Sequence, residues 1–253
     1  MSRPLVEALG ADRGIVSIVG AGGKKTTLYA LAAAHPGRVG VTTTVFMAKF
    51  SRRLGGHEIV SAVPDLSQEI AVAGRRNRIV AWARPSDKPG RVGGVTPGEV
   101  LAAHDAGGFD VTLVKADGAR MRAIKAPEAD EPVPADGTTL VVPLVSAAAF
   151  GRPLNDTIAH RPERIAAVTG LQPNATITPE AVGILLASEN GALKDIGDAR
   201  VVPIINAVDD ARLQEAAERT ARAALDATDR FERVVLTSHR RRQEPLVDII
   251  ERE

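Results

Sequence analysis

The sequence contains no cysteine among its 253 residues. This absence excludes disulfide bonds, thiolate metal ligands and any thiol or persulfide chemistry on the chain itself. Aromatic residues are scarce, at 3% of the sequence. Hydrophobic residues make up 44% and charged residues 25%, which is ordinary for a globular protein in water.

A bias toward charge of one sign is also missing, because the formal net charge is +1. No overall field therefore attracts the chain to nucleic acid or to a membrane surface, and we expect neither as a partner. No apolar run approaches the roughly 20 residues that a membrane span requires. The segment Met1–Glu7 lacks the apolar core of a signal peptide. We therefore expect a cytoplasmic protein.

One segment, Gly20–Thr27, has the composition of a phosphate-binding loop. It follows an apolar run, Ile15–Val19, and precedes Leu28–Ala34, which is rich in helix-forming residues. A strand, a glycine-rich loop with lysine and threonine, and then a helix is the order found in P-loop proteins. Glycines expose backbone N–H groups to an anion, and the helix start adds further donors. The predicted nucleotide-binding residues are Gly20, Ala21, Gly22, Gly23, Lys24, Lys25, Thr26 and Thr27.

Two alignments with the P-loop pattern are possible. In the first, Lys24 holds the phosphates, and Lys25 occupies the position where a magnesium-binding Ser or Thr is usual. In the second, Lys25 holds the phosphates and Thr26 binds magnesium. A glycine-rich turn carrying two solvated lysines is the alternative to both.

Two strands are expected to end near this loop. The segment 38–44 ends in Thr42, Thr43 and Thr44, and the segment 109–115 leads to Asp117. Ligands of open α/β sheets bind at the carboxyl ends of the strands, where a rigidly held acid can organise magnesium. We predict Thr26, Thr43 and Asp117 as metal ligands, and Lys24 and Asp117 as catalytic residues. Threonine as a simple strand former and aspartate as a turn residue are the alternatives.

Two later segments carry further candidates. Residues 119–137 are charged and rich in proline, so we expect a loop whose Arg120 and Lys125 either contact an anionic ligand or are solvated. The strand 200–206 runs into Asn206 and Asp209, a spacing similar to the guanine-reading Asn-Lys-x-Asp turn of GTPases. We predict both residues in nucleotide binding, with a plain Asn-capped turn as the alternative.

Alternating strands and helices indicate an α/β fold with a doubly wound, mostly parallel sheet and flanking helices, of the P-loop NTPase type. The prediction is a single domain over residues 1–253, with a loop-rich insertion around 117–137.

Several short motifs, spread over most of the chain, resemble those of one protein family when taken together. They are Val19-Gly20-Ala21-Gly22-Gly23-Lys24 with Thr26, Val41-Thr42-Thr43-Thr44, Ala116-Asp117-Gly118, Lys125-Ala126-Pro127, Glu131-Pro132, Gly151-Arg152-Pro153-Leu154, His160-Arg161-Pro162-Glu163, and Asn206 with Asp209. The chain resembles the P-loop accessory proteins of selenium-dependent molybdenum hydroxylases, the YqeC-like selenium cofactor biosynthesis family. The short loop and the threonine-ended strand also look like those of Mur-type ATP-dependent ligases.

The resemblance implies a nucleotide-binding fold, ATP or GTP with Mg²⁺ as cofactors, and a molybdenum hydroxylase or a maturation protein as partner. Lys25, Lys115 and Ala207 stand where the family pattern has Thr, Glu and Lys. Two of these changes place cations where a metal ligand or an acid is expected, so hydrolysis would be weak. A nucleotide-binding maturation factor is the first function predicted. A non-catalytic scaffold for a client enzyme, or a ligase that activates a carboxylate, are the alternatives.

Overall fold

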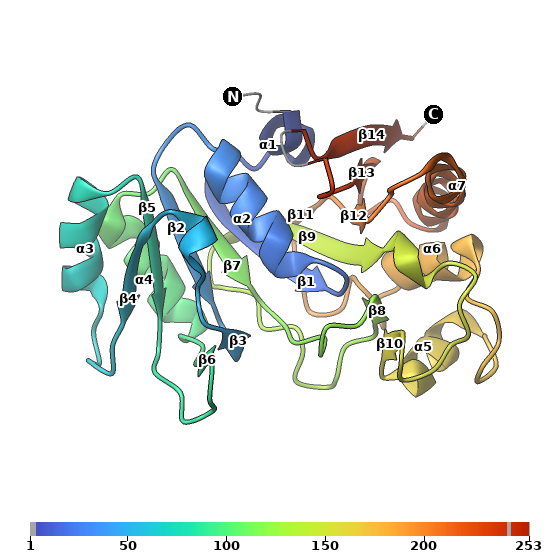
Figure 1. Cartoon of the computed structure of the whole chain (residues 1–253), viewed down its shortest axis with the longest axis horizontal. Coiled ribbons are helices and arrows are strands. Elements are labelled where there is room, and N and C mark those ends of the chain that lie inside the picture. The colour runs from blue at the N-terminus through green and yellow to red at the C-terminus, as the bar shows by residue number, and fades with distance from the viewer. Residues whose placement is uncertain (1–3, 242–243, 253) are drawn as a thin grey trace. The chain divides into compact units, whose positions relative to one another are not determined.

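Strands and helices alternate along the chain in the computed structural model, which describes residues 4–241 and 244–252 (Figure 1). The first three residues of the N-terminal segment considered for a signal peptide lie outside this range. The helices are α1 (Pro4–Leu9), α2 (Lys24–Ala34), α3 (Ser67–Arg76), α4 (Pro97–Gly107), α5 (Pro162–Thr169), α6 (Pro179–Ala187) and α7 (Ala211–Ala227), with short 3-10 helices at Arg52–Leu54 and Ala147–Ala149. Among the described residues, no helix combines the length and the apolar character needed to cross a membrane.

The strands are short and mostly parallel. They are β1 (Gly14–Gly20), β2 (Val39–Thr43), β3 (Met47–Ala48), β4 (His57–Val60), β5 (Ile79–Ala83), β6 (Arg91–Val92), β7 (Val111–Lys115), β8 (Ile124–Lys125), β9 (Thr138–Ser146), β10 (Ala159–His160), β11 (Arg200–Val201), β12 (Ile204–Asn206), β13 (Arg233–Thr237) and β14 (Leu246–Glu251). Ten of them belong to one sheet. The predicted α/β class with a mostly parallel sheet and flanking helices is therefore confirmed.

The described residues divide into two compact units. Within the described ranges, the first unit contains residues 4–18, 25–118 and 133–140, and the second contains residues 19–24, 119–132, 141–241 and 244–252.

Parallel strands in the order β1, β7, β2, β5 and β4 form the centre of the first unit. Every residue of β2 and β5 is buried, as expected for strands of a parallel sheet that is covered on both faces. Helices α3 and α4 pack against each other in this unit (Figure 1). Trp82 of β5 stacks on Phe109 with ring centroids 5.6 Å apart, in a core that is otherwise mainly aliphatic.

Helix α4 begins directly after Thr96, its N-cap residue. The Thr96 hydroxyl accepts a hydrogen bond from the Glu99 backbone N–H, and the Glu99 carboxylate accepts one from the Thr96 N–H. This reciprocal capping box satisfies two backbone donors that a helix start leaves unpaired. The left-handed Gly108 ends the helix.

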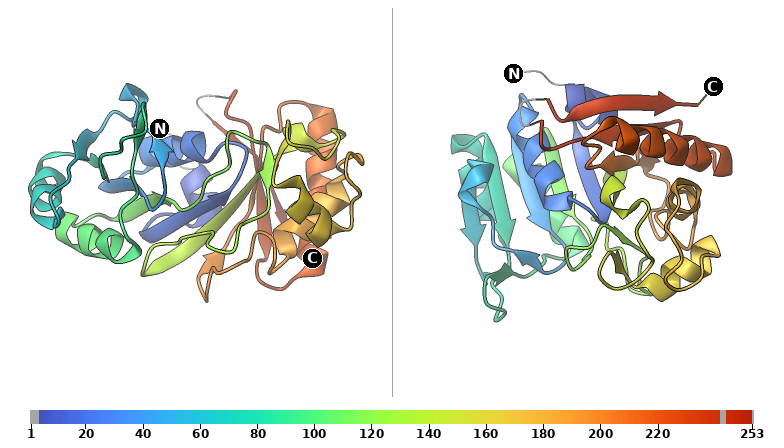
Figure 2. Two further views of the ribbon diagram at one scale, coloured as in Figure 1. Left: turned by 90° about the horizontal axis from the view of Figure 1, so that it is seen from below. Right: turned by 45° about the vertical axis from the view of Figure 1, so that its right-hand side comes forward.

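In the second unit, β12 pairs in parallel with β9 on one side and β13 on the other, and β14 adds an antiparallel edge strand. Helix α7 packs on α6 and on β13 (Figures 1 and 2). The segment 119–137, predicted as a loop, contains the two-residue strand β8, which pairs with β10. This strand was not predicted, because two residues carry no periodicity.

Candidate functional site

The loop after β1 has a backbone that requires glycine at three positions. Gly20, Gly22 and Gly23 have φ values of 88°, 87° and 134°, which side chains other than glycine rarely adopt. A Cβ on Gly22 would overlap the Ser146 side chain, and one on Gly23 would overlap the Asn206 amide. The glycines therefore serve both the left-handed turn and the close packing around it.

Strand ends of the second unit hold this loop in place. The Ala21 N–H donates to the Leu144 carbonyl of β9 at 2.7 Å. The Asn206 Nδ2 donates to the Gly22 carbonyl at 2.8 Å from the end of β12. These two bonds hold the loop backbone against β9 and β12.

Lys24 is the first residue of α2, and only 5% of it is exposed. Its ammonium turns back over the loop and donates to the Gly20 carbonyl. A lysine in this position carries its charge above the loop backbone, next to the positive end of the helix dipole. This geometry suits the phosphate lysine of the first alignment.

The neighbouring Lys25 is engaged elsewhere. Its Nζ donates to the carbonyls of Lys49 at 2.5 Å and of Ala48 at 3.2 Å, and lies 5.4 Å from the centroid of the Tyr29 ring. These contacts tie α2 to β3 and the residue after it. Thr26 is exposed, whereas Thr27 is fully buried. Which lysine holds phosphate stays a prediction. Because these contacts occupy the Lys25 ammonium, they favour Lys24.

Asp117 is buried in the first unit, two residues beyond the end of β7. Thr43 is the register partner of Lys115 in the neighbouring strand. The Lys115 Nζ donates to the main-chain oxygen of Asp117 at 2.6 Å and to that of Phe46 at 3.4 Å. The Lys115 ammonium therefore lies at the backbone of Asp117.

The three threonines at the end of β2 bond to main-chain carbonyls. Thr42 donates to Trp82 at 2.8 Å and Thr44 to Val133 at 2.6 Å. The Thr43 hydroxyl lies 2.8 Å from the Val45 oxygen and 2.9 Å from that of Lys115. These hydroxyls therefore have structural partners in this structure.

Within the described ranges 4–241 and 244–252, no group of three or more His, Asp or Glu side chains could hold a metal ion. The residues proposed for magnesium offer one carboxylate, of Asp117, and the hydroxyls of Thr26 and Thr43. Such a small donor set does not form an all-protein cage.

A turn at the end of β12 brings Asn206 and Asp209 into one polar cluster of the second unit. The Asn206 Oδ1 accepts from the Thr237 hydroxyl at 3.0 Å, and the Asp209 Oδ1 accepts from Ser238 at 2.6 Å. Ala207 between them has a φ of 63°, in the left-handed region. Backbone in this sparsely populated region is concentrated at functional sites.

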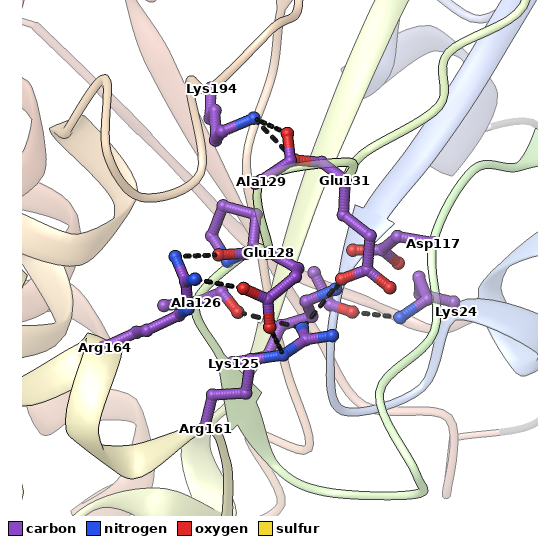
Figure 3. A network of polar contacts seen from close by, with 12 residues as sticks. Lys24, Asp117, Lys125, Ala126, Glu128, Ala129, Glu131, Arg161, Arg164 and Lys194 are labelled. Carbon is purple, nitrogen blue, oxygen red and sulfur yellow. Dashed lines mark hydrogen bonds and ion pairs between the residues drawn. The ribbon is translucent and has the colours of Figure 1, made fainter.

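The sequence analysis missed an ion-pair network in the second unit (Figure 3). Lys125, whose side chain is 1% exposed, lies 2.6 Å from the Glu131 carboxylate. Arg161 at the start of α5 pairs with Glu131 at 2.8 Å and with Glu128 at 2.9 Å, and Arg164 also pairs with Glu128. Lys125 is therefore buried beside a carboxylate and is not solvated, whereas its contact with an anionic ligand stays a prediction. The spacing of Arg161 and Arg164, about one helical turn apart, was the sequence feature that could have indicated this network.

Burial alone would raise the pKa of Glu131, but hydrogen bonds from Lys125 and Arg161 outweigh it and lower the pKa to about 2. His160 is the register partner of Lys125 across β10 and β8. Burial, and then the positive charges of Arg161, Lys125 and Arg120, lower the pKa of His160. The network therefore keeps Glu131 ionised and favours a neutral imidazole at His160.

A sequence model described as "YqeC protein" matches residues 16–163 of the chain. A relative from Escherichia coli (strain K12), described as "Uncharacterized protein YqeC", is 30% identical over 199 residues, which cover 76% of this chain and 75% of the relative. The chain belongs to the YqeC family. The family match contains the Gly20–Lys24 loop, Asp117 and Glu131, whereas Asn206 and Asp209 of this YqeC protein lie beyond it.

Proposed function

We propose that this YqeC protein binds a nucleoside triphosphate, ATP or GTP, on the loop Gly20–Lys24. The observation that carries the proposal is the loop itself. Its glycines adopt conformations that exclude side chains, strand ends hold its backbone, and the buried Lys24 opens the following helix. Backbone N–H groups and a lysine ammonium at a helix start are the donors that phosphate recognition uses.

Magnesium would accompany the nucleotide, with Asp117, Thr26 and Thr43 as its protein ligands. The Lys115 ammonium beside the Asp117 backbone opposes a second cation there by Coulomb repulsion. We therefore propose weak hydrolysis at most. The same observation favours a second candidate, a nucleotide-binding scaffold without turnover. Measuring the release of inorganic phosphate with and without a client enzyme distinguishes the two candidates.

The biological role that we propose is that of a cytoplasmic accessory factor in the maturation of selenium-dependent molybdenum hydroxylases. Support comes from membership of the YqeC family together with the motif resemblance. A Mur-like activation of a small carboxylate is the remaining alternative, and analysis of products formed from ATP or GTP tests it.

The test of nucleotide binding compares Lys24→Ala with Lys25→Ala. Lys24→Ala should weaken triphosphate binding about tenfold or more, because a hydrogen bond to a charged group contributes roughly 1.5–3 kcal/mol. Calorimetric titrations with ATP, GTP and CTP, each with and without Mg²⁺, measure the effect.

Lys25→Ala is the matched control, since it removes the same charge one residue away and should leave affinity near that of the parent. Equal affinities of Lys24→Ala and the parent would contradict the assignment of Lys24. A loss confined to Lys25→Ala would establish the second alignment.

A further inference from the structure

Three strands of the second unit end side by side where the loop Gly20–Lys24 is held. In the parallel register, Asn206 of β12 is the partner of Ser146 of β9 and of Thr237 of β13. Ligands of open parallel sheets are bound at these carboxyl ends. The cluster therefore lies where a nucleotide on the loop would place its remaining groups.

Asn206 joins the phosphate loop to this cluster through both ends of its amide. The nitrogen donates to the Gly22 carbonyl at 2.8 Å, and the oxygen accepts from the Thr237 hydroxyl at 3.0 Å. Because donor and acceptor each have a suitable partner, the orientation of the amide is determined. Only 6% of Asn206 is exposed. The residue thus holds the loop, β12 and β13 in one arrangement.

Asp209 follows three residues later, so its Cα lies no more than about 11 Å from that of Asn206. Its Oδ1 accepts from the hydroxyl of Ser238, which is 1% exposed, at 2.6 Å. This buried partner orients the carboxylate. The Oδ2 pairs with Arg240 at 3.0 Å, but the Arg240 side chain is 82% exposed. The Asp209 side chain itself is 15% exposed, so a ligand that uses the Oδ2 must share it with the Arg240 guanidinium or displace that group.

A carboxylate held in this way accepts hydrogen bonds and donates none at neutral pH. Guanine presents two adjacent donors on one edge, the ring N1–H and the exocyclic amine at C2. A carboxylate accepts both at once, and such paired, charge-assisted bonds are the strong ones. On the same edge, adenine presents an unprotonated N1 and a C–H, so the carboxylate meets an acceptor and gains no partner.

We propose that the nucleotide of this protein is a guanine nucleotide and that Asp209 reads its base. The inference rests on the proposed binding of a nucleotide by the Gly20–Lys24 loop. Ser238 is a positioning residue in this arrangement, because it orients the Asp209 carboxylate. Because residue 207 is alanine, no lysine side chain lies beside the base there, and the discrimination between guanine and adenine depends on Asp209.

The test varies the base of the nucleotide and the carboxylate of the protein together. Affinities for GTP, ATP and XTP are measured for the parent, Asp209→Asn and Asp210→Asn. The parent should bind GTP at least tenfold more tightly than ATP or XTP. Asp209→Asn should lose at least tenfold for GTP and gain affinity for XTP, because the asparagine amide accepts from N1–H and donates to the C2 oxygen of xanthine.

Asp210→Asn is the matched control on the adjacent carboxylate. Asp210 caps α7 by accepting the Leu213 N–H at 2.8 Å, a role that asparagine fulfils about equally well. This variant should keep the base preference of the parent. Ser238→Ala provides a second variant, which should lower GTP affinity while GTP stays preferred over XTP. It keeps the inference testable should Asp209→Asn unfold.

The outcomes distinguish the inference from the function on which it rests. Equal binding of ATP and GTP that is lost in Lys24→Ala would overturn the guanine inference and leave nucleotide binding intact. A GTP preference that survives in a folded Asp209→Asn would overturn the assignment of Asp209. Absence of any nucleotide binding to the parent would overturn both.

Discussion

Two neighbouring cations hold Glu131 in its ionised form. Its carboxylate lies between the buried Lys125 ammonium and the Arg161 guanidinium (Figure 3). The pKa of about 2 lies below the ordinary 4.5, so folding favours the ionised form. The resulting stability is present above pH 4.5 and is lost as the pH falls toward 2.

Glu131→Gln should lower the free energy of unfolding by roughly 3 kcal/mol at pH 7, because it leaves the Lys125 charge buried without its carboxylate. Urea unfolding at pH 7 and at pH 3 measures this. The difference between parent and variant should shrink at pH 3, where protonation of the unfolded chain already removes part of the contribution of Glu131.

Glu180→Gln is the control, since Glu180 and its partner Arg219 have side chains 49% and 58% exposed. Loss of such a surface pair should cost less than about 1 kcal/mol. Equal losses in the two variants would show that the Glu131 network is no stronger than a surface contact.

At the scale of the element, the loop between β1 and α2 depends on contacts as well as on backbone conformation. Gly22 and Gly151 both have positive φ, 87° and 73°. A Cβ on Gly22 would overlap the Ser146 side chain and lie 2.7 Å from the Ala123 oxygen, whereas nothing lies within 4 Å of one on Gly151. Comparing alanine substitutions at these two glycines therefore separates the cost of backbone strain from the cost of steric overlap.

Gly151→Ala should destabilise the fold by only about 1–2 kcal/mol, the cost of a left-handed alanine. Gly22→Ala should cost more and should weaken nucleotide binding at least tenfold, because the loop must move away from β9. Thermal unfolding and GTP titration of both variants measure the two effects. Equal melting temperatures and equal affinities would show that the loop adapts without moving its phosphate donors.

At the scale of the whole molecule, the 253 residues offer no thiol. A role in selenium delivery must therefore consist of binding, energising or docking, since no cysteine is present to carry selenium covalently. The intact mass of the purified chain should stay unchanged after incubation with selenide and nucleotide. An adduct of one selenium atom per chain would refute this.

Local patterns were enough to predict the α/β class and the order of strand, glycine loop and helix. Each depends on residues close together in the chain, as does the capping of α4 by Thr96 and Glu99, which spans one helical turn. The strand β8 and the edge strand β14 were not predicted, because their pairing is decided by partners that sequence periodicity does not reveal. The prediction of a single domain stays a prediction.

The sequence by itself determined which residues could form a phosphate loop, but not what each one contacts. Lys24 and Lys25 are adjacent lysines, and only the tertiary structure directs one over the loop and the other to residues 48 and 49. Asn206 reaches a carbonyl 184 positions away in the chain. Such contacts follow from the register of strands that come from distant segments, and burial then fixes the partners of each polar group.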